Sequence, residues 1–559
     1  MADATLGPDG GVGTTTRRTA PADIGFGIAV ATVAVAGAYV ILRDRAWLPV
    51  SDLAILELQL RGLLQDPPLL GSYSRYGWSH PGPLFTYLMW VPWRLTGGNP
   101  SGLLLGMLLL HLGAVVVAWF AARAIAVAAA VLVAAGLLVV WAAGAPTDAL
   151  IPWNPHAGVV LGGTIVALGW NAAGRGRLGA LLLLPLASLA VQAHIGTAFL
   201  AVAVCGSAIG LSLAGWMQRD PVPWSAWGWS IGITTLLWVA PVWEQLRAGG
   251  GNLTAIVATD SGPGLGLGRA IAVVSDAFAL GPYWWSPTFK FLPEVAGPPV
   301  LLIIPAAATV VAIVRRDPTH VRAVVVCALA GAAAIASVWQ ATPPGQSYLV
   351  AWLPGVAVTI VTLCLWVLLD AWSATPPVVW LAPALLPLAA AGVAINLISN
   401  SAPLAEQGAR VRSVADAVTQ EGLAQGGVHL VTGQYTGSEA LEWVPGVANE
   451  LQRRGTDVSA ELPPEWPSSL AELTPSEPGE RTPVMIRGMQ RPDEPIPADW
   501  RVVVTEDPFT PAEWKEMLRL RAVIADEAAP PSERGLAWLG IAEIARNRQA
   551  WQILVPTQN

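Results

Sequence analysis

Long apolar runs separated by short polar connections dominate the first 400 residues of the chain. Most of these runs have the ~17–25 helical residues needed to cross the hydrocarbon core of a membrane. The pattern predicts eleven membrane-spanning helices, at residues 24–42, 101–120, 124–143, 157–171, 178–195, 196–215, 227–243, 297–314, 322–339, 347–369 and 377–397. The first run is too long for a signal-peptide core and has no convincing cleavage site, which favours a retained anchor.

A further apolar stretch, residues 81–93, is short and is interrupted by Pro81, Pro83 and Pro92. A segment of this length cannot span the hydrocarbon core as a helix. The prolines also remove backbone donors that a lipid-exposed helix needs. The stretch therefore predicts a re-entrant or interfacial segment.

The arginines of the short connections indicate which way the membrane part faces. With eleven crossings, the cytoplasmic connections contain Arg17, Arg18, Arg123, Arg175, Arg177, Arg219, Arg315, Arg316 and Arg322, as the positive-inside rule expects. If residues 81–93 also crossed, most of these arginines would lie outside. We therefore expect a multi-pass plasma-membrane protein with a flexible cytoplasmic N-terminus (1–23), a transmembrane domain (24–399) and an extracytoplasmic C-terminal domain (400–559).

The C-terminal residues have a different pattern, which predicts a small α/β domain. Residues 428–431, 484–486 and 502–504 are short apolar runs typical of strands. Residues 511–525 and 536–545 have helical spacing. The expected fold class is thus an α-helical polytopic membrane protein with a C-terminal soluble α/β domain.

Composition supports this division and excludes several classes of protein. Only 12% of the 559 residues are charged, against about 25% in a soluble protein. Of the 69 charged residues, 37 lie in the last 159 positions, where the net charge is −9. This acidic balance, with no basic stripe, argues against nucleic-acid binding. The three cysteines, Cys205, Cys327 and Cys364, lie in apolar runs and predict neither disulfides nor a zinc site.

The first predicted outer loop, residues 43–80, is the densest cluster of ionisable groups near the membrane. Leucines at helical spacing predict an amphipathic helix over residues 53–64 that lies on the membrane surface, with Ser51 as its N-cap. Asp52 stands at the start of this helix, where it acts either as a cap or as a functional carboxylate. Glu57 and Arg61 form an i,i+4 pair that is either a solvated ion pair or part of a substrate site.

Three histidines, His80, His156 and His194, fall at the outer ends of predicted spans. Such residues either form hydrogen bonds at helix ends or bind a substrate hydroxyl or a divalent metal ion, for which His80 and His156 are the candidate ligands. His111 lies within a span, where packing is the simpler interpretation.

The order of these features resembles the GT-C superfamily of integral-membrane glycosyltransferases. In that family an acidic residue follows the first span, as Asp52 does here, and a surface helix comes next, as at 53–64. A His-Pro-Pro-like entry into a short apolar segment is similar to 79–88 (SHPGPLFTYL), and the second outer loop is similar to 152–156 (PWNPH). Residues 346–354 (QSYLVAWLP) are similar to the family's Arg-Tyr-Leu-x-Pro helix start.

The chain departs from the family pattern at two positions. Leu53 follows Asp52 where the family often has a second acid, and Gln346 replaces the usual arginine, which removes an expected phosphate contact.

The resemblance implies a membrane glycosyltransferase. It would transfer a sugar, with inversion, from a polyprenyl-phosphate-linked donor to a cell-envelope glycan or lipoglycan acceptor at the outer face of the membrane. Asp52 would be the general base. A cation would neutralise the leaving phosphate, with candidates Arg43, Arg45, Arg61, Arg75, Arg247, Arg269 and Lys290, of which Arg75 and Lys290 are favoured. The expected substrate-binding residues are Glu57, Arg75, His80, His156, His194, Trp284, Trp285, Lys290, Gln346 and Tyr348.

Other interpretations remain open from the sequence. Trp284 and Trp285 fit sugar stacking and an interfacial aromatic belt equally well. A transporter or flippase of lipid-linked saccharides is the alternative class, although transporters tend to have charged or broken helices near the bilayer midplane and matching halves. A membrane-anchored scaffold would leave the outer-face grouping of acids, histidines and arginines without a role.

Overall fold

The computed structural model describes most of the chain. It leaves out residues 1–12, 75, 145–149, 219–220, 248–250, 260–263, 283–291, 294–295, 344, 374–376, 401, 403, 432–436, 462–480, 490, 494, 527, 530, 546–547 and 558–559. The chain folds into two compact units. The helical unit consists of Met1–Arg45 and Leu69–Pro403, and the α/β unit consists of Ala46–Pro68 and Leu404–Asn559. Residues 46–68, which the sequence grouped with the membrane domain, thus belong to the C-terminal unit.

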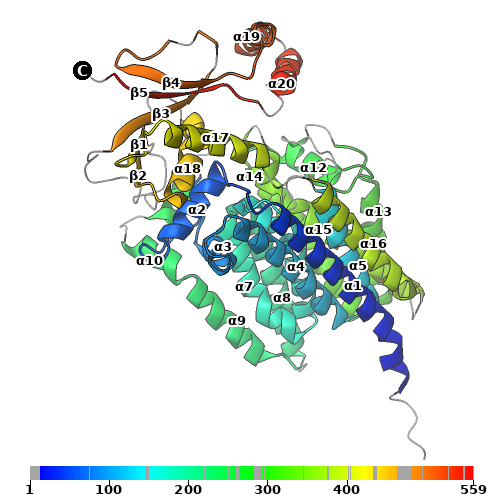
Figure 1. Ribbon diagram of the computed structural model, residues 1–559. Coiled ribbons are helices and arrows are strands. Elements are labelled where there is room, and N and C mark those ends of the chain that lie inside the picture. The colour runs from blue at the N-terminus through cyan, green and yellow to red at the C-terminus, as the bar shows by residue number, and fades with distance from the viewer. Residues whose placement is uncertain are drawn as a thin grey trace, which may run out of the picture. The chain divides into compact units, whose positions relative to one another are not determined.

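Among the described residues, seven segments of the helical unit are long and apolar enough to cross a membrane. Their helices are α1 (Gly13–Arg43), α4 (Ser101–Arg123), α6 (Gly158–Ala173), α8 (Ala198–Met217), α14 (Pro318–Gln340), α15 (Leu353–Trp372) and α16 (Val378–Ser399) (Figure 1). Three shorter apolar helices are α5 (Val127–Ala143), α7 (Arg177–Ala193) and α13 (Ile303–Arg315), the last extended by η4 (Val300–Leu302). The chain is therefore a polytopic helical membrane protein.

The run predicted as a single span at 227–243 forms two helices, α9 (Trp224–Leu237) and α10 (Val239–Arg247). Pro241 has no N–H to donate to the carbonyl of Leu237 four residues earlier, so the helical ladder is interrupted there. The side chain of Gln192 on α7 supplies the missing donor, with Nε2 at 2.9 Å from that carbonyl oxygen. All eleven predicted runs fall on helices, while eleven complete crossings remain a prediction.

The short stretch at 81–93 corresponds to α3 (Leu84–Leu95), a helix of 12 residues. At about 1.5 Å per residue it is roughly 18 Å long, which is shorter than the ~30 Å hydrocarbon core. It packs against α4 and α7. That this segment does not cross the membrane stays a prediction.

Helix α6 is the centre of the helical unit. It packs against α4, α7, α8 and α15, and all of its residues except Val159 are buried. Glycines allow α6 and α15 to approach closely: a β-carbon on Gly163 would lie 2.4 Å from the carbonyl oxygen of Gly355. Small residues at such crossings are the usual means of close helix packing in membranes.

Shorter elements connect the long helices. They are η1 (Asn154–Ala157), η2 (Ile195–Thr197), α11 (Asn252–Ala258), α12 (Leu267–Asp276) and η5 (Ser347–Val350). Three of them lead directly into a long helix: η1 into α6, η2 into α8 and η5 into α15. Of the three histidines that the sequence predicted at the ends of spans, His156 lies in η1 and His194 directly precedes η2.

The α/β unit contains a five-stranded sheet of order β2-β1-β3-β5-β4. The strands are β1 (Val428–Val431), β2 (Val458–Ala460), β3 (Thr482–Gly488), β4 (Trp500–Glu506) and β5 (Trp551–Pro556). Strands β2, β1 and β3 run parallel, and β5 is antiparallel to β3 and β4. The helices of the unit are α2 (Asp52–Gly62), α17 (Ala405–Gln420), α18 (Gly437–Arg453), α19 (Pro511–Ala525) and α20 (Pro531–Ala545) (Figure 1).

The helix expected on the membrane surface forms, as α2, but its environment differs from the prediction. The residues from Leu53 to Leu60 are all buried, including Glu57 and Gln59 on the expected polar face; the position of α2 relative to a membrane stays a prediction. Helix α2 packs against α18 of the same unit. Ser51 stands at the N-cap position with a positive φ of 53°, and its side chain makes no capping hydrogen bond, so the predicted cap is wrong.

Candidate functional site

Six aromatic and histidine side chains of the helical unit form two series of ring contacts. Ring centroids lie 5.4 Å apart for Trp78 and His80, and 4.9 Å apart for His80 and His194. A second series joins His156 to Trp153 at 5.5 Å and Trp153 to Tyr348 at 4.9 Å. His156 is also close enough to His194 to lower the pKa of His194. We call these six residues, Trp78, His80, Trp153, His156, His194 and Tyr348, the aromatic–histidine cluster.

His80 is held by a short antiparallel pairing of the chain with itself. The backbone N–H of His80 donates to Ser72 (2.8 Å), and its carbonyl accepts from Gly71 (3.0 Å). The preceding residue, Ser79, exchanges two hydrogen bonds of 2.7 Å with the side chain of Asn252. These contacts leave the His80 ring little freedom to move away from His194.

The hydrogen bond to the His80 ring determines its tautomer. The backbone N–H of Ile195 donates to Nδ1 at 3.2 Å, so Nδ1 is an acceptor and Nε2 holds the hydrogen of the neutral ring. Burial, followed by the nearby His194, holds the pKa of His80 well below its ordinary value. His80 is therefore neutral at physiological pH, with Nε2–H as its donor.

His194 follows the last residue of α7 and is also buried. Burial, followed by the nearby His156, lowers its pKa to about 4. Its Nδ1 has no hydrogen-bond partner among the described residues. A β-carbon on Gly196 would lie 2.9 Å from this nitrogen, so only glycine leaves room for the ring here.

His156 and Tyr348 are positioned by the turns that precede α6 and α15. Asn154 of η1 donates from Nδ2 to the carbonyl of Ala193 at 2.8 Å, which ties η1 to the end of α7. Pro155 stands in the first residues of the turn, where its fixed φ is favourable. Gln346 is half-buried at the N-cap of η5, and its carbonyl accepts from Leu349 at 3.1 Å.

The cluster thus lies where four helices begin and one ends, because its residues stand just before α3, α6, α8 and α15 and just after α7. Helix N-termini present unpaired N–H groups and the positive end of the macrodipole, which favours bound anions. None of the six cluster residues is acidic. The arrangement suits a negatively charged group such as a phosphate.

One predicted phosphate-binding cation lies next to this region. The side chain of Arg269 on α12 donates from Nη2 to the carbonyl of Leu292 at 3.1 Å. The backbone N–H of Leu292 in turn donates to Gly345 at 2.8 Å, directly before Gln346. The same Nη2 would be 3.5 Å from a β-carbon on Gly345.

The other candidates are in different settings. Arg43 bonds to Asp44 and to the carbonyls of Ile398 (2.8 Å) and Asn400 (2.6 Å). Arg45 and Arg247 are exposed. Four predicted residues, Arg75, Trp284, Trp285 and Lys290, lie outside the described part of the chain.

Asp52 and Glu57 both belong to the α/β unit. Asp52 is the first residue of α2 and is half-buried, at the helix end where a negative charge is stabilised. The carboxylate of Glu57 is completely buried and accepts hydrogen bonds from Arg61 at 2.8 Å and from Arg453 at 2.7 and 2.9 Å. The two acids, five residues apart, therefore have very different surroundings.

No metal centre is evident in the part of the chain that the structure describes. No group of three or more histidine, cysteine, aspartate or glutamate side chains is placed there to hold an ion. His80, one of the two predicted ligands, has its Nδ1 engaged by Ile195. His111 is buried with its ring 5.3 Å from Trp141, in an edge-to-face contact.

Three polar residues support the cluster: Asn154, which lies in the motif noted at 152–156, and Gln192 and Asn252, which sequence reasoning missed. Oε1 of Gln192 has no hydrogen-bond partner in the described ranges, and it would lie 2.1 Å from a β-carbon on Gly82. A glutamine inside the apolar run 178–195 is a signal that could have drawn attention to it.

Comparisons with known proteins complete the description. No protein-family model and no curated protein matches the chain. The fold is similar to that of ArnT from Cupriavidus metallidurans. The structure of ArnT bound to undecaprenyl phosphate is 13% identical, with a TM-score of 0.44 over 82% of this chain and 92% of that one. The apo structure of ArnT is 12% identical, with a TM-score of 0.47 over 83% and 93%.

Proposed function

We propose that the protein is a membrane glycosyltransferase that takes a sugar from a polyprenyl-phosphate-linked donor. Both TM-scores to ArnT are below 0.5, so the proposal rests on the residues of this chain. The observation that carries it is the convergence of three segments that resemble GT-C motifs. Residues 79–83, 152–156 and 346–350 come together at the N-terminal ends of α3, α6 and α15.

The chemistry of this region fits a donor that contains a phosphate. Converging helix N-termini stabilise negative charge without adding a titratable group. Arg269, beside the turn before Gln346, is the described cation best placed to neutralise the phosphate as it leaves. It would compensate for the arginine that Gln346 replaces.

The cluster also offers groups that suit a sugar. Nε2–H of His80 is a fixed donor for a hydroxyl or phosphate oxygen. Trp153 and Tyr348 present aromatic surface in contact with each other, and such surface packs well against the apolar faces of sugars.

In the proposed reaction, the carboxylate of Asp52 accepts the proton of the acceptor hydroxyl. The hydroxyl oxygen attacks the anomeric carbon, the bond from that carbon to the phosphate oxygen breaks, and the configuration inverts. The polyprenyl phosphate leaves with the bonding electron pair. We propose a cell-envelope glycan or lipoglycan as acceptor and the outer face of the plasma membrane as the site of transfer.

The test is transfer by the purified full-length protein from radiolabelled polyprenyl-phosphate sugars to a mixed envelope acceptor. Asp52→Asn is expected to lower kcat by about 10²–10⁴-fold, because a general base contributes that much. Asp66→Asn is the matched control, since Asp66 is an exposed carboxylate in the same segment of the chain. The anomeric configuration of the product, read by NMR, tests inversion.

Two results would refute the proposal. Undiminished transfer by Asp52→Asn removes Asp52 as the base. Movement of the lipid-linked saccharide across the membrane with no transfer indicates the alternative function, a flippase. Orientation is tested separately by labelling Gln65→Cys and Gln218→Cys in cells: we expect the first to react from outside and the second only from the cytoplasm.

A further inference from the structure

Residues 46–68 lie in the first predicted outer loop, yet they fold with the C-terminal residues. The chain passes between the two units at Arg45–Ala46, at Pro68–Leu69 and at Pro403–Leu404. Asp52 is therefore part of the α/β unit, although both flanks of its segment belong to the helical unit. Contacts with α17 and α18 hold α2, and with it Asp52, inside the α/β unit.

The first contact is made by a buried asparagine on α18. Asn449 donates from Nδ2 to the carbonyl of Ala54 at 2.9 Å, and its Oδ1 accepts from Nε of Arg61 at 3.0 Å. Its side chain is fully buried. One amide thus bonds both the first and the last turn of α2, which fixes the helix along its axis.

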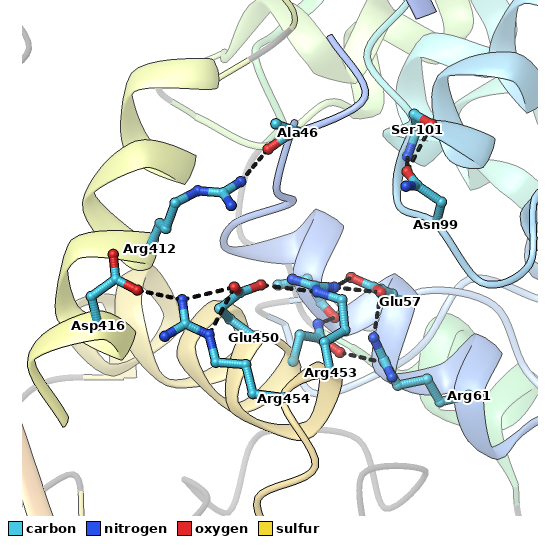
Figure 2. A network of polar contacts seen from close by, with 12 residues as sticks. Ala46, Glu57, Arg61, Asn99, Ser101, Arg412, Asp416, Glu450, Arg453 and Arg454 are labelled. Atoms are coloured by element: carbon cyan, nitrogen blue, oxygen red, sulfur yellow. Dashed lines mark hydrogen bonds and ion pairs between the residues drawn. The ribbon is translucent and has the colours of Figure 1, made fainter. Parts of the chain in front are cut away.

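The second contact is a network of ion pairs that runs from α2 through α18 to α17 (Figure 2). Arg453 bonds to both carboxylate oxygens of Glu57 and, from Nε, to Glu450 at 2.9 Å. Glu450 also accepts from Arg454 at 2.9 Å, and Arg454 pairs with Asp416 at 2.7 Å. With Arg61, the network contains three arginines and three acids.

The chain that leads into α2 is held as well. The side chain of Arg412 on α17 donates to the carbonyl of Ala46 (Figure 2). A β-carbon on Gly408 would lie 2.7 Å from the carbonyl oxygen of Leu48, so α17 packs directly against this backbone. Residues 46–61 are therefore fixed at both ends by α17 and α18.

Burial makes the pairing of Glu57 specific. A fully buried carboxylate is retained only when it is paired and hydrogen-bonded. Replacing one partner leaves the other charge buried and unpaired, whereas replacing both is often tolerated. The two arginines on Glu57 thus favour a single position of α2 against α18 over any alternative register.

We propose that the α/β unit carries and positions the catalytic base. Glu57, Arg453 and Asn449 act as positioning residues that hold α2, and Asp52 stands five residues before Glu57, about 7.5 Å along the helix axis. The inference rests on the proposed function of Asp52 as base. It gives Glu57 a role in holding the base in place of the substrate contact expected from the sequence, and it gives the C-terminal unit a direct part in the reaction.

Two readouts on the full-length protein test this proposal. Hydrogen exchange of peptides covering residues 50–62 measures how strongly the contacts with α18 protect the amides of α2. Steady-state kinetics separate kcat from the KM of the donor and of the acceptor. In Glu57→Gln and in Arg453→Gln we expect faster exchange in this segment and a 10- to 100-fold lower kcat, with both KM values unchanged within twofold.

Three control variants separate the effect of the Glu57–Arg453 pair from the effect of removing any charge in the α/β unit. Glu516→Gln removes an exposed ion pair with Arg519 on α19 and is expected to change neither readout. Arg453→Lys keeps the charge but loses the forked geometry, and we expect partial recovery of kcat relative to Arg453→Gln. In the Glu57→Gln, Arg453→Gln double variant, the fold-decrease in kcat is expected to be smaller than the product of the decreases in the two single variants.

Several outcomes would overturn the proposal. Faster exchange with unchanged kcat means that the contacts only stabilise the unit. A raised KM with unchanged kcat means that Glu57 binds substrate. If a single variant fails to fold, the double variant, in which both charges of the pair are removed, is measured in its place and has to show the same loss of kcat. Full activity of Asp52→Asn refutes the base itself, and unaltered exchange in that variant distinguishes this failure from a failure of the α2–α18 contacts.

Discussion

The crossing of α6 and α15 provides a sharp test of how packing inside the helical unit supports the site. A β-carbon on Gly355 would lie 2.1 Å from the carbonyl oxygen of Val159, more than 1 Å closer than an ordinary contact. The β-carbon has no torsion that could move it and the oxygen belongs to the backbone, so rotation of a side chain cannot relieve the clash. In Gly355→Ala the two helices therefore have to separate by about 1 Å.

This separation is expected to lower both the free energy of unfolding and the rate of sugar transfer. Overpacking of a tight interior costs about 1–3 kcal/mol. The turns that precede the two helices contain His156 and Tyr348, and Trp153 contacts both side chains. A displacement of about 1 Å in a positioned site lowers rates by roughly 100-fold. We therefore expect Gly355→Ala to be less stable and about 100-fold slower in transfer.

The assay combines thermal unfolding in detergent with the transfer reaction. Gly210→Ala on α8 and Gly331→Ala on α14 are the matched controls, because a β-carbon at either position meets no atom within 4 Å. Both controls add the same methyl group to a long helix of the same unit. If Gly355→Ala unfolds and reacts as the controls do, the inference that this crossing positions the site is refuted.

Three further predictions concern single side chains. Gly82→Ala is expected to lower the unfolding temperature and the rate of sugar transfer, because the new methyl would lie 2.1 Å from Oε1 of Gln192. Thermal unfolding and the transfer assay measure the two effects. For His194, burial lowers the pKa from 6.5 to about 4, so its contribution to stability is complete above pH 6.5 and is lost as the pH falls towards 4. For Glu513, the hydrogen bond from Arg548 lowers the pKa from 4.5 to about 2, so its contribution is complete above pH 4.5 and is lost towards pH 2. Unfolding temperature measured against pH checks both windows.

Each of these predictions has its own control. Shortening the clashing side chain in a Gly82→Ala, Gln192→Ala double variant should recover part of the loss. His194→Gln should unfold with a flatter pH dependence between 6.5 and 4, and an unchanged slope would contradict the assignment. Glu513→Gln should flatten only the range between 4.5 and 2, and a change above pH 5 would mean that another group is responsible.

The helices of the membrane part could be predicted because the signal is local. An apolar run long enough to span the membrane leaves few alternatives to a helix, since every backbone polar group has to be satisfied internally. All eleven runs fall on helices for this reason. The division at Trp238 was missed because it depends on Pro241 together with Gln192, which is distant in sequence.

The α/β unit was predicted less completely. Residues 428–431, 484–486 and 502–504 lie in strands, and both predicted helices form. Strand β2 has only three residues, too few for a periodic pattern, and β5 is buried on both faces and shows no alternation. Helix α18 contains Pro445, which argues against a helix in a single sequence.

For the candidate site, the sequence could identify the residue types but not their partners. The end-of-span positions of His80, His156 and His194 follow from counting apolar runs. The structure brings the rings of His80 and His194 into contact, and the turn that contains His156 is bonded to the end of α7 beside His194. The tautomer of His80 could not be predicted, because it depends on a backbone N–H of Ile195, 115 residues away. Asn252 was missed for a similar reason, since its side chain bonds backbone atoms of Ser79, which is distant in sequence.

The two acids of α2 illustrate why spacing alone cannot assign a catalytic carboxylate. Glu57 and Arg61 have ideal i,i+4 spacing, and the ion pair forms, but Arg453, 396 residues later, also binds the same carboxylate. A completely buried carboxylate whose oxygens accept hydrogen bonds from two guanidinium groups is shielded from a substrate hydroxyl, so it is poorly placed to act as a base. Asp52 retains partial exposure at the start of the helix. If α2 supplies a base, the environment of the two acids therefore favours Asp52, and Glu57 determines where that base is held.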